Sequence, residues 1–416
     1  MSSAEADPPR EKFPPTFYYA NAIELFERFA FYGTYIGLAL YLARVVGYSD
    51  IEVGFWLANY RLMASLAPIP CGAIADRITF KRSLILAFIL YSFAYASLFL
   101  FPSRALAPLG LLGMAIGGGF MKPVITGTVV RTAPEGRQTE GFAVFYRMIN
   151  AGSVLGKTAA YAVRSLIGLR FVMINSVLAS MVALALAIFG YKEPARGASK
   201  PGGSFGQTVR GYGTALKDLR FTAFLIIFAG FYFMSDQFYM TFPQYVTRHI
   251  DQKAPLELIT LINPALIALF QGRVTLVFKK YSPITSMLAG MVIASISMFV
   301  MGSVPGLAGA CLSGAIFALA EMTFSPRFFD YIASFAPEGK AGMYMGLAFV
   351  PAALGSWTGG MLSGPMIKKY LPVDGARDPF RVWTTYAAAG LVCAVAMLIY
   401  RRVYADHEKA PPAAAA

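Results

Sequence analysis

The feature that most constrains this chain is a series of long apolar runs that recurs along almost the whole sequence. Hydrophobic residues make up 57% of the 416 residues, and charged residues only 14%. A run of about 20 apolar residues has the length that an α-helix needs to cross the hydrocarbon core of a bilayer. The sequence therefore predicts an all-α membrane protein with the lipid bilayer as its first partner.

Hydropathy divides the chain into twelve predicted membrane-spanning helices. An even number places both termini on one side, and the loops predicted on that side carry more Lys and Arg than the opposite loops. By the positive-inside rule we expect a multi-pass protein of the plasma (inner) membrane with both termini cytoplasmic. The predicted helices are 17–44, 51–75, 83–102, 106–131, 141–166, 169–191, 219–247, 255–279, 284–303, 306–333, 341–368 and 380–402.

A polar stretch at 192–218, rich in Pro and Gly, separates the first six predicted helices from the last six. We interpret it as a cytoplasmic linker between two six-helix bundles, 17–191 and 219–402. Such a layout is typical of major facilitator transporters, whose substrate site lies between the bundles near the midplane. We expect a disordered N-terminal tail at 1–16 and a C-terminal tail at 403–416. We expect no cleaved signal peptide.

The remaining composition excludes several other classes of function. The net charge of +14 is explained by cytoplasmic Lys and Arg, so we expect no nucleic acid as a partner. The cysteines Cys71, Cys311 and Cys393 lie in apolar segments without metal-ligand spacing. We therefore expect neither a metal nor an organic cofactor. The two histidines, His249 and His407, lie near segment ends, away from the core.

The first apolar run contains two acids and a base, at Glu24, Glu27 and Arg28. Their spacing of i, i+3 and i+4 places all three on one face of a helix. Charges at membrane depth are costly and are functional by default, so this face must look into a protein interior or an aqueous cavity.

Further polar side chains interrupt later apolar runs. Lys122 either has an acid or an anionic ligand beside it or extends its ammonium to the membrane interface. Asn150 suits either a peptide group or an interhelical hydrogen bond. Lys157, seven residues after Asn150, faces either the same cavity as Asn150 or the seam where helices pack. Asp236 lies either deep in the membrane, where a charge indicates function, or near the outer edge, where water solvates it.

Two segments indicate moving parts. Pro326 has no N–H, which leaves the Met322 carbonyl without its helical partner beside the buried acid Glu321. The glycine-rich run at 341–368 suits a helix that bends or slides during gating, and its Trp357 either plugs a cavity or only packs.

The loop from Gly72 to Arg82 resembles the cytoplasmic loop motif of the major facilitator superfamily, with Thr79 where a second glycine is usual. Asp76 can cap a helix end there, while Arg77 and its basic neighbours hold a cytoplasmic gate. An ordinary positive-inside loop is the alternative.

The chain as a whole resembles the proton-coupled oligopeptide transporters of that superfamily. The stretch from Glu24 to Gly33 is similar to the family's ExxERFxYY motif, with Phe31 in place of a tyrosine, and Phe145 to Ser153 is similar to its FYxxINxGS signature. Other positions similar to the family are Lys122-Pro123, Asp236-Gln237, Asn263-Pro264, and Glu321 with Ser325-Pro326.

The resemblance implies a symporter that imports di- or tripeptides, or peptide-like compounds, by alternating access, with protons as the coupling ion. It implies that Arg28 and Lys122 hold the peptide carboxylate and that Glu321 meets the amino group. Proton coupling falls to Glu24, Glu27 and Asp236, and gating to Asp76, Arg77, Pro326 and Trp357. The remaining predicted substrate-binding residues are Tyr32, Tyr60, Asn150 and Asn263.

Two departures from the family pattern keep alternatives open. Tyr35 stands where many members have a second arginine, and Arg61 adds a positive charge near the site. These changes favour, as one alternative, a more anionic or modified peptide-like cargo. A peptide sensor that does not translocate is another. We do not expect an enzyme, since Glu321 and Ser325 have no third residue to complete a catalytic group. We expect a monomer, because one chain contains both halves of the transport pathway.

Overall fold

The computed structural model describes residues 12–134, 137–194, 211–337 and 341–405. All regular secondary structure in this part of the chain is helical, which confirms the all-α prediction. The predicted tails and linker lie largely outside the described residues. The first group of helices is α1 (Pro15–Tyr35), α2 (Leu38–Arg44), α3 (Asp50–Leu66), α4 (Pro68–Ile78), α5 (Phe80–Leu100), α6 (Ala107–Thr132), α7 (Gln138–Leu166), η1 (Leu169–Phe171), α8 (Val172–Ala185) and η2 (Leu186–Gly190).

The second group follows residue 211 and completes the described chain. It comprises α10 (Leu219–Ser235), α11 (Gln237–Met240), α12 (Phe242–Tyr245), η3 (Val246–Ile250), α13 (Leu256–Ile259), α14 (Ile262–Phe278), α15 (Pro283–Ser303), α16 (Gly306–Ser334), α17 (Ala341–Leu347), α18 (Phe349–Tyr370), α19 (Pro379–Tyr400) and η4 (Arg401–Ala405).

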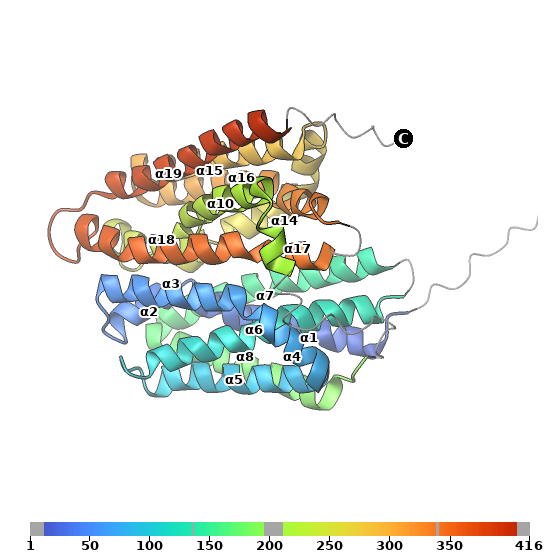
Figure 1. The fold of residues 1–416 in the computed structure, drawn as a ribbon. Coiled ribbons are helices and arrows are strands. Elements are labelled where there is room, and N and C mark those ends of the chain that lie inside the picture. The colour runs from blue at the N-terminus through green and yellow to red at the C-terminus, as the bar shows by residue number, and fades with distance from the viewer. Residues whose placement is uncertain (1–11, 135–136, 195–210, 338–340, 406–416) are drawn as a thin grey trace, which may run out of the picture.

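The two groups form two stacked layers of roughly parallel helices (Figure 1). We call α1 to α8 the N-terminal layer and α10 to α19 the C-terminal layer. Each layer has its own buried apolar cluster. Ile36 and Leu40, at the junction of α1 and α2, are exceptions because they join the cluster of the C-terminal layer. The layers therefore meet closely at the end of the molecule that contains α2.

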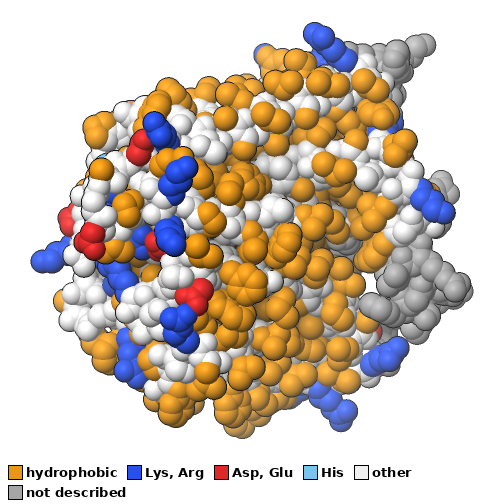
Figure 2. All heavy atoms as spheres, turned by 60° about the vertical axis from the view of Figure 1, so that its left-hand side comes forward, with side chains coloured by type: hydrophobic (Ala, Val, Ile, Leu, Met, Phe, Trp, Pro, Cys, Tyr) orange, Lys and Arg blue, Asp and Glu red, His pale blue; other side chains and the backbone are white. Residues whose placement is uncertain are grey.

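The surface fits a lipid environment. Among the described residues, nine helical segments are long and apolar enough to cross a membrane. Figure 2 shows a broad hydrophobic surface with charged side chains gathered toward the ends of the molecule. α1 and α7 are comparably long but are not among the nine; they carry ionisable side chains such as Glu27 and Lys157. The chain is thus a multi-pass membrane protein.

Short breaks divide several of the predicted membrane-spanning helices. The affected ranges are 17–44, 51–75, 219–247, 255–279 and 341–368. A glycine or proline stands at or shortly after most of these breaks, because proline removes a backbone donor and glycine weakens a helix. The break at Asp236, between α10 and α11, has neither. The other breaks are marked by Gly37, Pro68, Pro243, Pro264 and Pro351.

Thr79 joins α4 to α5 in the left-handed region, with φ of 87°, and is the one non-glycine residue with positive φ in the described chain. This conformation favours glycine, which explains physically why glycine is usual at this position of the loop motif. Thr79 Oγ1 accepts a hydrogen bond from Arg82 N and caps α5.

Candidate functional site

The two acids and the base of α1 form a buried cluster. Arg28 Nε lies 3.2 Å from Glu24 Oε1 and bonds directly to Glu27. Tyr91 of α5 donates its hydroxyl proton to Glu27 Oε1 at 2.7 Å. Glu24 and Glu27 are both buried, so the cluster lies inside the N-terminal layer. We call Glu24, Glu27, Arg28 and Tyr91 the α1 cluster.

Close packing of α1 on α7 positions this cluster. Gly152 and Gly156 of α7 are one turn apart and face the α1 backbone. A Cβ at Gly152 would lie 2.5 Å from the Leu25 carbonyl oxygen, and one at Gly156 would lie 2.2 Å from that of Phe29. Small residues spaced in this way let membrane helices approach closely, so α7 holds the charged face of α1 in a fixed place.

Tyr32 links the α1 cluster to a neighbouring cation. The Arg28 guanidinium lies 5.9 Å from the centre of the Tyr32 ring, and Lys157 Nζ lies 5.6 Å from it. Lys122, on α6, has an exposed side chain whose Nζ lies 4.5 Å from the Phe349 ring of α18. An exposed ammonium at this depth, facing the opposite layer, indicates an aqueous space between the layers.

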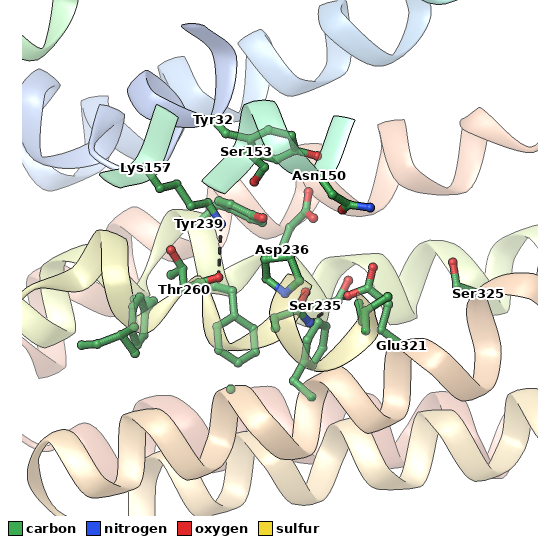
Figure 3. Close-up of a pocket in the computed structure, with 18 of the residues that line it drawn as sticks. Tyr32, Asn150, Ser153, Lys157, Ser235, Asp236, Tyr239, Thr260, Glu321 and Ser325 are labelled. Carbon is green, nitrogen blue, oxygen red and sulfur yellow. Dashed lines mark hydrogen bonds between the residues drawn. The ribbon is translucent and has the colours of Figure 1, made fainter. Parts of the chain in front are cut away.

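A cavity of about 370 Å³ lies between the layers. Figure 3 shows side chains of α1 and α7 on one side of it and side chains of the C-terminal layer on the other. Its charged lining residues are Lys157, Asp236 and Glu321. Its further polar and aromatic lining includes Tyr32, Tyr146, Asn150, Ser153, Tyr232, Ser235, Tyr239, Thr260, Asn263 and Ser325.

Glu321 is held on the wall formed by the C-terminal layer. Asn263 Nδ2 donates to Glu321 Oε2 at 3.0 Å. One residue further along α16, the Met322 carbonyl accepts a hydrogen bond from Gln271 of α14 at 3.1 Å. This is the carbonyl that Pro326 leaves without a helical partner, and α16 continues unbroken through that proline.

Asp236 is paired across the layers. Arg61 of α3 donates to Asp236 Oδ2 from Nη2 at 2.9 Å and from Nε at 3.2 Å, and Ser356 of α18 bonds to the same oxygen. The Arg61 guanidinium also lies 5.5 Å from the centre of the Tyr35 ring. Asp236 therefore balances the positive charge of Arg61. For this reason Arg61 no longer favours an anionic cargo.

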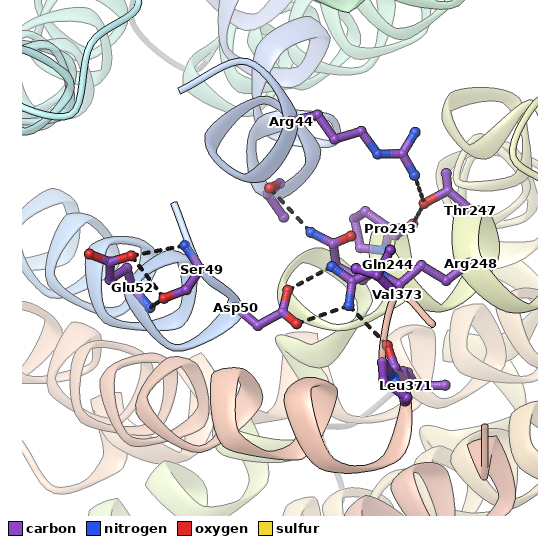
Figure 4. A network of polar contacts seen from close by, with 12 residues as sticks. Arg44, Ser49, Asp50, Glu52, Pro243, Gln244, Thr247, Arg248, Leu371 and Val373 are labelled. Atoms are coloured by element: carbon purple, nitrogen blue, oxygen red, sulfur yellow. Dashed lines mark hydrogen bonds and ion pairs between the residues drawn. The ribbon is translucent and has the colours of Figure 1, made fainter. Parts of the chain in front are cut away.

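Further ion pairs join the layers at one end of the molecule. Arg248 binds Asp50 through two contacts of 2.6 and 2.9 Å, and Arg164 binds Glu257 through contacts of 2.5 and 2.8 Å. Figure 4 shows Arg248 with Asp50 and the Leu371 carbonyl, and Arg44 with Thr247 nearby. We call the pairs Asp50–Arg248 and Arg164–Glu257 the α2-end pairs.

The predicted gating residues lie elsewhere. Asp76 lies 3.8 Å from Arg131 of the same layer, and Arg77 is exposed. Pro326 is exposed and Trp357 is half-buried. Their gating roles remain predictions.

Five of the predicted site residues line the cavity, and they come from both layers. They are Tyr32, Asn150, Asp236, Asn263 and Glu321. Glu24, Glu27, Arg28, Tyr60 and Lys122 are not among the lining residues of this cavity. Sequence reasoning left Lys157 undecided, although its spacing of seven from Asn150, two helical turns, was a usable signal.

Charged side chains around a cavity between two layers of apolar helices are typical of membrane transport proteins. The model of the Major Facilitator Superfamily matches residues 22–360, and the chain belongs to this family. It is 24% identical over 334 residues to an uncharacterized MFS-type transporter, YqjV of Bacillus subtilis, covering 78% of this chain and 80% of the relative. It is 24% identical to the multidrug resistance protein MdtH of Proteus mirabilis, covering 76% and 78%.

Solved structures show the same fold at low sequence identity. A peptide transporter POT in complex with sulfate matches with a TM-score of 0.80 and 16% identity, covering 95% of this chain and 96% of that one. A POT family transporter in complex with 5-aminolevulinic acid matches with a TM-score of 0.77 and 19% identity, covering 94% and 96%. The fold is therefore that of the POT transporters.

Proposed function

We propose that the protein spans the membrane twelve times, in bundles 17–191 and 219–402 joined by the linker 192–218. Both termini face the cytoplasm of an inner-membrane protein. Under this topology the α2-end pairs lie at the outer face, so the described state is closed to the outside. The separate apolar clusters of the two layers support this division.

We propose that the protein is a proton-coupled symporter that imports di- or tripeptides or peptide-like compounds, not an enzyme. The single observation that carries the proposal is the polarity of the cavity. In the cavity lining, the base Lys157 comes from the N-terminal layer and the acid Glu321 comes from the C-terminal layer. Opposed charges on facing walls match a zwitterion, whose two ends need opposite partners. The names of the structural neighbours support the same substrate class.

In this proposal Arg28 and Lys122 bind the peptide carboxylate and Glu321 binds the amino group. Asn150 and Asn263 bond to the backbone and amino end, and Tyr32 and Tyr60 shape the pocket. Protons are the coupling ion and no other cofactor takes part. A single chain contains the whole pathway and functions as a monomer.

Proton coupling follows from the α1 cluster, where Arg28 is bonded to both Glu24 and Glu27. Protonation of one acid removes a competitor for the guanidinium and frees Arg28 to reach the substrate across Tyr32. Proton and peptide then stabilise the same state, which couples their binding. The layers rock about the cavity, which opens and closes the α2 end of the molecule. Opening separates Asp236 from Arg61 and breaks the α2-end pairs.

The test is uptake of di- and tripeptides by proteoliposomes under an inward pH gradient. We expect concentrative uptake that collapses with the gradient. Glu321→Gln should weaken peptide binding by about tenfold or more, because the amino group loses a charged partner. Undiminished affinity of this variant would move the amino site elsewhere. Counterflow without net accumulation would indicate an exchanger, and binding without either would indicate a sensor.

A drug exporter is a second candidate, favoured by the MdtH relatives. Export of cationic dyes from the same vesicles, without competition by dipeptides, would replace the peptide proposal.

A further inference from the structure

Lys157 is a buried ammonium that the proposed contacts to the two ends of the peptide leave without an assigned partner. It is 2% exposed, yet it lines the cavity together with Glu321. Lys157 Nζ donates a hydrogen bond to the Thr260 carbonyl at 3.2 Å. Within the described residues it has no ion pair with a carboxylate. The acid Glu321 acts on Lys157 only across the cavity, without an ion pair. A buried charge that lacks an ion-pair partner is costly, so Lys157 needs a further explanation.

The Thr260 carbonyl explains how Lys157 is held. In a continuous helix this oxygen would accept from the N–H of Pro264, which proline lacks. The break between α13 and α14 thus leaves an acceptor at the cavity edge, and Lys157 crosses from α7 to reach it. An ammonium has three donors, so two remain for a ligand.

The charges around the cavity indicate which chemical group on a substrate would balance them. Asp236 is neutralised by Arg61, which leaves Lys157 and Glu321 as the opposed charges of the lining. Once Glu321 binds the amino group of a peptide and Arg28 and Lys122 bind its terminal carboxylate, Lys157 is left without a negative partner. A second carboxylate on the substrate would supply one.

We infer that Lys157 forms a second anion subsite that selects substrates with an acidic side chain. This inference rests on the proposed peptide transport and specifies its substrate class. The ammonium gives up no other salt bridge to bind the carboxylate, and Tyr32 and Ser153 line the same part of the cavity (Figure 3).

The experiment compares Ala-Glu with Ala-Gln as competitors of gradient-driven uptake of labelled Ala-Ala. The two competitors differ in side-chain charge at nearly constant shape. We expect the wild-type protein to bind Ala-Glu about tenfold more tightly, the size of a charge-assisted hydrogen bond. Lys157→Gln keeps a donor for the Thr260 carbonyl and removes the charge, so the ratio should fall to about one. Lys157→Arg should keep the preference.

Lys253→Gln is the matched control, because it removes an exposed lysine from the loop before α13 and should leave the ratio unchanged. Equal affinity of the wild-type protein for the two peptides, or an unchanged ratio in Lys157→Gln, would overturn the subsite while leaving peptide transport intact. Absence of any peptide uptake by the wild-type protein would overturn the proposed function and this inference with it.

Discussion

Glu27 and Glu257 are both buried carboxylates, each 1% exposed and bonded to an arginine, yet their partners lie on different sides of the layer interface. Glu27 pairs within the N-terminal layer, with Arg28 and Tyr91. Glu257 pairs with Arg164 of the opposite layer. In the proposed mechanism, a bond inside one layer persists while the layers rock, whereas a bond between layers must break. The first kind suits proton and substrate chemistry, and the second suits a gate.

Helix packing repeats this difference. The glycines Gly152 and Gly156 join α7 to α1 inside the N-terminal layer. Gly54 of α3 faces Gly360 and Gly364 of α18 across the interface, and a Cβ at Gly54 would lie 2.5 Å from the Gly360 carbonyl oxygen. Small residues therefore permit close approach in both places, but only the second contact has to separate during transport.

The largest expected effect is in the α1 cluster. Glu27→Gln should reduce pH-gradient-driven uptake by about 100-fold, because the coupling between proton and substrate is lost. The measurement is peptide uptake as a function of external pH. Glu52→Gln, at an exposed carboxylate of α3, is the control. Uptake by Glu27→Gln with the wild-type pH dependence would contradict the assignment of Glu27 as a proton-coupling residue.

The two glycine contacts test the comparison directly. Gly156→Val should destabilise the folded protein by about 3 kcal/mol or more, because α1 and α7 stay packed in every state. Gly54→Val should fold but fail to close the α2 end. Thermal unfolding in detergent reports the first effect. Labelling of Ile259→Cys, at a cavity-lining position, by an impermeant maleimide reports the second.

For this labelling, Cys71, Cys311 and Cys393 are first replaced by alanine so that the introduced thiol is the one that reacts. Equal destabilisation by the two valines, with unchanged labelling, would mean that both contacts are permanent and that the distinction between them is false.

The smallest expected effect concerns a single α2-end pair. Glu257→Gln leaves Arg164 buried without its charge partner, which should raise labelling of Ile259→Cys by about tenfold or more. The double variant Arg164→Gln with Glu257→Gln should label less than either single variant. Arg381→Gln, from an exposed pair, is the control. Additive effects of the two single changes would show that this pair does not hold the gate.

The sequence alone was sufficient to identify charged residues whose position in a membrane segment is energetically costly. Glu24, Glu27 and Arg28 could be assigned to one helical face from spacing, and the structure places them in one cluster. The break near Pro68 was not predicted, since hydropathy averages over a short kink.

Arg61 shows what sequence could not decide. It was interpreted as an extra positive charge, but its partner Asp236 lies 175 residues away. The family pattern implied an arginine at the position of Tyr35, and here α3 supplies the guanidinium instead. No local spacing reveals such an exchange, because the contact exists only after the two layers have packed.

Apolar length, charge asymmetry and the α1 charges are properties of single segments in a bilayer, and the sequence by itself determined them. The bilayer acts on each helix separately, so hydropathy and spacing are enough. Which charges meet across the cavity, and which remain without a partner, depends on the register of helices far apart in the chain. The tertiary structure decided that Asp236 belongs to Arg61 and that Lys157 faces the cavity, because only packing sets those distances.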